Sequence, residues 1–466
     1  MSSIDPSADY RAMAVALRVG SLLLAGGSST DDVERSMRRV ALAAGLAEVQ
    51  SVVTLGILTM SAVRASDGQP ITQLRLVSQR TSEYRRLTAA AELVDRLESG
   101  VVSADAAIAE LDRIDALPAA YSPLVMTLAI ALSSAAAVLL FGGGAADAVV
   151  TLAIGLAVDP VVQRLDRSPL PEFFRALIGP LLATLLAIVL VAVGLPIDGG
   201  LIVTAAILRF LPGSALVAGM RDLIDRSIIS GTARLAEAML LGSAVAVGTA
   251  AGIRIGAALG GPALTVGVLT ASTEGLLLQG VAAAVACATF GLALGVDRRR
   301  LLSVGLLGGG AWLVNLLGMQ LGWDLLLPVV VAAVMVGAAG QALALQVRMP
   351  SVVWTVPAIL PLLPGLTIVR GILELGTIAG VLTVVAAIGI GFALGAGVAF
   401  GSILVAVARQ AGEAAQAVML PVLGEIDPVR AVGAISRTTR RRRPRRGRAT
   451  GGEGSAPGEG TADEGP

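Results

Sequence analysis

Long apolar stretches dominate the chain from residue 122 onward. Each is close to the ~20 residues that an α-helix needs to cross ~30 Å of hydrocarbon. Of the 466 residues, 55% are hydrophobic and 15% are charged, and the mean hydropathy is +0.81, a balance typical of membrane proteins. The sequence therefore predicts a mainly α-helical, multi-pass membrane protein. The ten expected spans lie at about 122–141, 146–165, 176–195, 200–220, 235–256, 277–296, 301–321, 325–346, 352–372 and 378–408.

Residues 1–121 have the more polar pattern of a small soluble α+β domain. A glycine-rich turn at 26–31 is interpreted as a helix cap, with Asp31 and Glu34 at capping-box spacing. It is not interpreted as a phosphate-binding loop, because no Gly-Lys-Ser/Thr follows. The expected elements are helices at 10–24, from the turn to about 44, at 81–99 and at 103–117, and a hairpin formed by β-rich runs at 49–63 and 71–77.

Arginine is concentrated in alternate loops. The loops after the second, fourth, sixth and eighth spans carry arginine, whereas those at 142–145, 196–199, 257–276 and 322–324 carry none. Since basic loops stay in the cytoplasm, we expect both termini on the cytoplasmic side of the cytoplasmic membrane. Arg370, near the outer end of the ninth span, is an exception to this pattern.

The segment 409–466 is a polar tail with a basic block at 437–448. Its composition predicts a disordered cytoplasmic segment. We interpret the basic block as a topology anchor or a contact with anionic lipid. Nucleic-acid binding is disfavoured, because no aromatic residues interleave the arginines.

Several kinds of chemistry are excluded by composition. The sequence contains no histidine and one cysteine, Cys287. Ser/His/Asp triads, His-ligated zinc and intrachain disulfides are therefore excluded, and carboxylates are the remaining proton carriers near neutral pH. An intramembrane protease is disfavoured for the same reason. We expect no enzymatic activity, no metal centre and no cofactor.

An internal repeat relates the two halves of the membrane region. Residues 207–223 and 359–375 are identical at eight of seventeen positions, at an offset of 152, including Leu-Pro-Gly. The same offset carries the five spans of 122–256 onto the five spans of 277–408. Because five is odd, the second unit must enter the membrane in the opposite orientation. The sequence thus predicts two inverted five-helix repeats, an arrangement typical of secondary transporters.

The matched segments place Pro212-Gly213 inside the fourth span and Pro364-Gly365 inside the ninth. Proline removes a backbone donor and glycine tolerates unusual dihedral angles, so each helix is expected to break there. Polar backbone groups freed at such a break are tolerated in a membrane only inside protein or beside a wet cavity. The four residues are therefore candidates for substrate binding, with a structural kink as the alternative.

Polar side chains within the spans supply further candidates. Arg209 lies midway along the fourth span, where a charge costs ~3 kcal/mol, so it needs a partner or an anionic ligand. Asp159 is the expected partner of Arg209 or a proton carrier, and Glu237 is a second candidate proton carrier. The uncharged candidates for substrate binding are Thr204 and Thr355, in the turns that precede the two breaks, and Asn315 and Gln341, for which interhelical hydrogen bonding is the alternative.

Three groups of residues resemble the threonine/serine exporter family in its fused form, a soluble N-terminal domain followed by ten spans. The resemblance covers roughly residues 9–410. The residues that carry it are Gly26–Thr30 with Val33, Glu34 and Met37, then Pro212-Gly213 with Asp222 and the run 230–238, and finally the run 357–365.

This resemblance implies a secondary transporter that exports small hydroxy amino acids, driven by protons. Export of small dicarboxylic or other organic acids is one alternative. A membrane-anchored regulatory or scaffolding protein that acts through residues 1–121 is another. The expected partners are an amino-acid substrate, protons and the lipid bilayer. A homo-oligomer is also compatible with the sequence.

Overall fold

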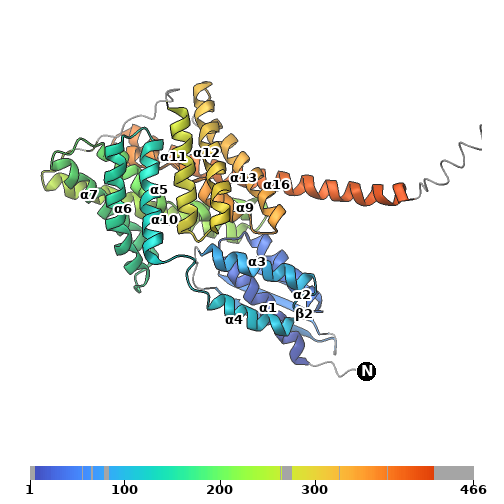
Figure 1. Cartoon of the computed structure of the whole chain (residues 1–466). Coiled ribbons are helices and arrows are strands. Elements are labelled where there is room, and N and C mark those ends of the chain that lie inside the picture. Colours follow the sequence, from blue (N-terminus) through green and yellow to red (C-terminus); the bar gives the residue numbers. More distant parts are fainter. Residues whose placement is uncertain are drawn as a thin grey trace, which may run out of the picture. The chain divides into compact units, whose positions relative to one another are not determined.

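The computed structural model describes residues 6–424, except 55, 65–66, 78–82, 263, 265–274, 325 and 375 (Figure 1). The chain divides into two compact units, Met1–Val407 and Ala408–Pro466. The basic block expected at 437–448 lies outside the described residues.

The N-terminal region is a small α+β fold with a three-stranded antiparallel sheet in the order β1-β2-β3. The run expected as one strand at 49–63 is two strands, so that prediction was wrong in detail. The chain reverses at Gly56, whose φ of +81° favours glycine, and Thr54 pairs with Ile57. The elements are α1 (Pro6–Ala25), α2 (Thr30–Ala43), β1 (Ala47–Thr54), β2 (Ile57–Val63), β3 (Pro70–Leu76), α3 (Tyr84–Glu98) and α4 (Ala104–Asp115).

The 26–31 turn caps α2, as expected, although not through the predicted pair. Ser29 is the N-cap, and its Oγ accepts a hydrogen bond from the amide of Asp32. Glu34 instead accepts from the amide of Val53 at 2.8 Å and so joins α2 to β1. Burial raises the pKa of Glu34, although that hydrogen bond opposes the shift.

The apolar stretches of the membrane region are helical, which confirms the mainly α-helical membrane class. Among the described residues, eight helices are long and apolar enough to cross a membrane, and two bent pairs raise the number to ten. The continuous helices are α5 (Pro123–Leu140), α6 (Ala145–Asp166), α7 (Glu172–Ala192), α10 (Ile228–Ala258), α11 (Leu276–Ala293), α12 (Arg298–Gln320), α13 (Leu327–Val347) and α16 (Ile378–Gly424).

The fourth and ninth spans are interrupted where the sequence predicts. The first comprises α8 (Gly199–Ile207), a 3-10 turn η1 (Leu208–Phe210) and α9 (Gly213–Ile224), with a bend of 52°. The second comprises α14 (Val352–Ala358), η2 (Leu360–Leu362) and α15 (Gly365–Leu373), with a bend of 42°. Each bend therefore coincides with a Leu-Pro-Gly segment of the repeat.

α10 begins earlier than the sequence indicates. It starts at Ile228 rather than near 235, so Arg234 and Glu237 lie inside the helix and not at its start. Arg234 is only 2% exposed, which makes it a structural cation and not a solvated loop charge. The helix also carries the exposed Arg254 near its end.

Candidate functional site

The two interruptions lie against each other. A Cβ atom on Gly213 would lie 3.4 Å from Ile359 Cδ1, and one on Gly365 would lie 2.7 Å from Leu208 Cδ2. Each glycine thus packs on the other interrupted span, and Gly365 leaves no room for a side chain without a shift of Leu208. The sequence-predicted candidates at the two breaks are brought together in space.

The backbone takes the same local form at both breaks. The amide of Gly213 donates to the carbonyl of Leu211, and that of Gly365 donates to Leu363, both at 2.8 Å. A proline lies between the donor and the acceptor residue of each hydrogen bond. Its φ/ψ angles are −79°/56° at Pro212 and −77°/44° at Pro364, close to those of an inverse γ-turn. The repeat in the sequence is therefore a repeat in conformation.

Asp159 of α6 forms an ion pair with Arg209 of η1, which confirms the expected partnership. Asp159 is fully buried and also accepts hydrogen bonds of 2.6 Å from Thr127 Oγ1 and from Gln163 Nε2. The Arg209 guanidinium lies 4.8 Å from the ring centroid of Phe210. Pairing lowers the cost of placing both charges in an apolar region.

A second buried ion pair joins the membrane helices to the N-terminal domain. Asp222 of α9 is fully buried and lies 3.1 Å from Arg234 Nε of α10. The Asp222 carboxylate accepts from the amide of Thr30 at 2.7 Å and from its hydroxyl at 3.0 Å. Arg234 Nη2 donates to the carbonyl of Ser28 at 3.0 Å. Residues that carry the family resemblance in three separate segments therefore meet at this point.

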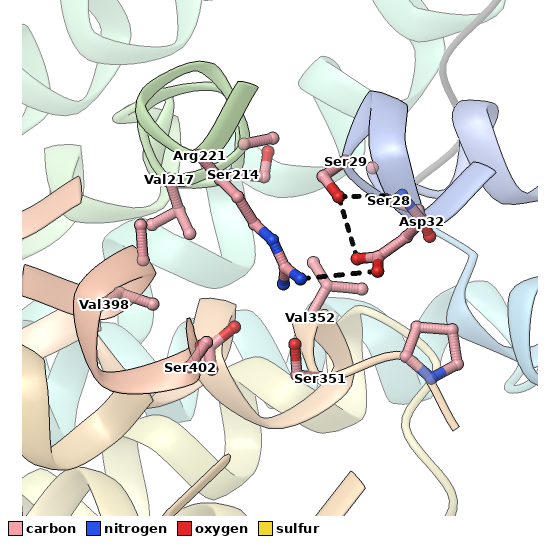
Figure 2. Close-up of a pocket in the computed structure, with 15 residues that line it drawn as sticks. Ser28, Ser29, Asp32, Ser214, Val217, Arg221, Ser351, Val352, Val398 and Ser402 are labelled. Carbon is pink, nitrogen blue, oxygen red and sulfur yellow. Dashed lines mark hydrogen bonds and ion pairs between the residues drawn. The ribbon is translucent and has the colours of Figure 1, made fainter. Parts of the chain in front are cut away.

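A pocket lies beside this junction (Figure 2). It holds about 420 Å³ of empty space, part of which is open to solvent. Asp32 and Arg221 are its charged residues, and the N–O distance between them is 3.4 Å. The other lining side chains are small and mostly hydroxylated or apolar. The hydroxyl groups belong to Ser28, Ser29, Ser214, Ser351, Thr355 and Ser402.

Two polar atoms of the pocket lining lack hydrogen bonds among the described residues. Ser28 is 4% exposed, and its Oγ has no hydrogen-bond partner there. Arg221 Nε also makes no hydrogen bond, and the carboxylate of Asp225 lies 3.6 Å away. Burial raises the pKa of Asp225, against the lowering effect of Arg221.

Of the remaining sequence-predicted candidates, Thr204 lies at the paired breaks, since a Cβ atom on Gly365 would lie 3.7 Å from Thr204 Cγ2. Thr204 is buried in α8, where its hydroxyl donates to the carbonyl of Gly200 at 2.8 Å. Thr355 lines the pocket, whereas Asn315, Gln341 and Glu237 are not among its lining residues. The amide of Asn315 faces Met319 Sδ of its own helix at 3.9 Å.

Sequence reasoning missed most of the pocket. Serines at 28, 214, 351 and 402 come from four distant segments, and no spacing in the sequence links them. Within the part of the chain that the structure describes, no group of three or more His, Cys, Asp or Glu side chains could hold a metal ion.

Comparisons with known proteins agree with this architecture. Residues 14–256 match a family model described as a putative threonine/serine exporter, and residues 279–405 match a second model described as a threonine/serine exporter. A probable threonine/serine exporter of Mycobacterium tuberculosis is 27% identical over 426 residues, which cover 86% of this chain and 78% of that protein. The threonine/serine exporter of Corynebacterium glutamicum is 26% identical over 404 residues, covering 84% and 81%. No solved structure matches the chain significantly.

Proposed function

The chain belongs to the threonine/serine exporter family, and we propose that it exports threonine and serine across the cytoplasmic membrane. Family membership makes it a membrane transporter rather than an enzyme. The names of both relatives support hydroxy amino acids as the cargo, and the proposal for this chain rests on that likeness.

The proposed mechanism is alternating access around the two interrupted spans. The observation that carries it is the contact between the two breaks, which share one backbone form. In addition, α8 contacts α15 while α9 contacts α14, so each half of one interrupted span meets the opposite half of the other. In the proposed arrangement, residues 122–256 and 277–408 are inverted repeats related by a pseudo-two-fold axis, which would account for this exchange, and rocking of the repeats would open each side in turn.

Proton coupling is proposed to act through buried carboxylates. Asp159 is the principal candidate, because protonation would weaken its ion pair with Arg209. The released guanidinium could then bind the carboxylate of the substrate. Glu237 in α10 is the second candidate proton carrier.

Substitution of the break prolines tests the proposed mechanism. Pro212→Ala and Pro364→Ala restore a backbone donor at each break and favour a continuous helix. We expect labelled threonine efflux from proteoliposomes to fall about tenfold or more in each variant, with normal expression. Pro180→Ala is the matched control, since Pro180 lies inside the continuous helix α7, and it is expected to transport like the unmodified chain. Normal efflux in both break variants would refute a site at the paired breaks.

The proposed orientation can be tested by cysteine labelling in intact cells. The structure buries Cys287, so the unmodified chain is an unlabelled background. A membrane-impermeant maleimide added outside is expected to label Ala146→Cys and to spare Leu170→Cys, both at exposed positions. The positive-inside rule places the first of these sites outside and the second in the cytoplasm. Labelling of Leu170→Cys alone would reverse the proposed topology.

The alternatives predict different results in the same proteoliposomes. Export of small organic acids predicts efflux of a dicarboxylate such as succinate in preference to threonine. A scaffolding role predicts no flux of either compound. Buried contacts between the N-terminal domain and α9, such as Thr30 with Asp222, support a joint role of both parts in transport.

A further inference from the structure

We infer that the pocket in Figure 2 is the cytoplasmic-side binding site for the amino acid, and that the N-terminal domain supplies one wall of it. This inference rests on the proposed function and names the contacts of its substrate. Four segments form the site: the turn at 27–32, α9, the start of α14, and α16. The N-terminal domain is then part of the transport machinery rather than an appended regulator.

The charges of the pocket fit a zwitterion. Arg221 and Asp32 are the charged residues of the lining, one of each sign, and Figure 2 shows the Arg221 side chain directed at Asp32. An α-carboxylate can bind the guanidinium and an α-ammonium group can bind the carboxylate. A dicarboxylate would instead bring a second negative charge toward Asp32, which is unfavourable.

The Arg221 side of the ion pair is open enough to accept such a ligand, whereas Asp32 also accepts hydrogen bonds from Arg35 Nη2 at 2.7 Å and from Ser29 Oγ at 2.8 Å. Arg221 Nη2 and Asp32 Oδ1 are 3.4 Å apart, longer than the ~2.7–2.9 Å of a strong charged hydrogen bond. Arg221 Nε makes no hydrogen bond among the described residues, so the guanidinium retains donor capacity. The substrate carboxylate could therefore accept hydrogen bonds from both Nε and Nη2 of Arg221 without breaking a short hydrogen bond of Arg221.

The Ser28 hydroxyl provides a site for the side-chain hydroxyl of threonine or serine. Its Oγ is buried at the pocket and has no hydrogen-bond partner among the described residues. A buried hydroxyl without a partner is costly, and a substrate hydroxyl can both donate to it and accept from it. The same position gives no benefit to valine or alanine, which lack the hydroxyl.

The pocket lies on one side of both breaks. α9 follows the first break and α14 precedes the second, and Ser214 comes directly after Gly213. The proposed topology makes this side cytoplasmic. An amino acid held there would lie next to the interruptions that are proposed to open toward the outside.

Substrate selectivity tests the role of Ser28. We expect Ser28→Ala to lower the threonine-to-valine ratio of kcat/KM by about tenfold, since it removes one hydrogen bond to the substrate hydroxyl. The serine-to-alanine ratio should fall likewise. Ser21→Ala is the control, because Ser21 bonds to Arg18 within α1, away from the pocket, and it should leave both ratios unchanged.

The charged pair is tested by direct binding of labelled threonine to the purified full chain. Arg221→Gln and Asp32→Asn should each raise the Kd for threonine by roughly 10- to 100-fold. Arg221→Lys keeps the positive charge but loses the planar guanidinium that can bind a carboxylate through two hydrogen bonds, and it should give an intermediate Kd. Asp67→Asn, which removes an exposed carboxylate that pairs with Arg64 and is outside the pocket lining, is the control and should bind normally.

The outcomes separate this inference from the proposed function. If the unmodified chain transports threonine but folded Arg221, Asp32 and Ser28 variants keep its Kd and selectivity, the site is wrong and the function stands. If the unmodified chain carries no threonine at all, the function itself fails. Should a charge variant not fold, the Ser28→Ala selectivity ratio still decides.

Discussion

Arg234→Met is expected to destabilise the folded chain by about 3–5 kcal/mol. The substitution removes the cation that faces Asp222 and leaves a fully buried carboxylate whose other contacts come from Thr30. The melting temperature of the purified protein in detergent should fall by several degrees. Protease cleavage within residues 1–121 should also become faster, because Arg234 and Asp222 hold the N-terminal turn.

Two further variants make this prediction specific. Arg370→Met breaks an exposed pair with Glu374 and is expected to change stability by less than ~1 kcal/mol. Asp222→Asn combined with Arg234→Met removes the orphaned charge and should be more stable than Arg234→Met alone. Equal melting temperatures for Arg234→Met and Arg370→Met would show that the buried pair does not hold the two regions together.

Asp159→Asn is expected to abolish the acceleration of threonine efflux by an inward proton gradient. A coupling free energy of 1–3 kcal/mol corresponds to an acceleration of about 5- to 150-fold, and this factor should fall to one. Asparagine keeps hydrogen-bonding capacity toward Thr127 and Gln163 but cannot take up a proton. Exchange of internal for external threonine, which needs no net proton movement, should continue.

The comparison for Asp159→Asn comes from the same helix. Asp166→Asn removes an exposed carboxylate at the end of α6 that pairs with Arg175, and its gradient response should be normal. Glu237→Gln tests the second candidate. If Glu237→Gln loses the gradient response and Asp159→Asn keeps it, the proton carrier has been assigned to the wrong residue.

Much of the membrane region could be predicted from the sequence because its constraints are local. Bilayer length sets the size of each apolar stretch, and proline and glycine set the positions of both breaks. The start of α10 could not be placed in this way. Arg234 and Ser230 look like loop residues, and only their buried contacts with Asp222, Ser28 and Val53 explain why they are helical.

The candidate site was only partly accessible to sequence reasoning. Asp159 and Arg209 could be paired because charges inside apolar spans are rare and must compensate each other. The pocket depends on serines and one arginine that are ordinary surface residues by composition. Its Ser28 and Asp32 come from a domain that the sequence presents as separate, so three-dimensional packing was needed to find them.

The two interrupted spans are proposed to open the path alternately, and cysteine accessibility measures this opening on each side of the breaks. Ser351→Cys reports on the pocket side of the breaks, and Thr204→Cys reports on the α8 and α15 side. Maleimide labelling of each is measured with and without saturating threonine, with the unmodified chain as background. We predict that threonine changes the two labelling rates in opposite directions. Rates that rise or fall together, or that do not respond to threonine, would contradict alternating access at the paired breaks.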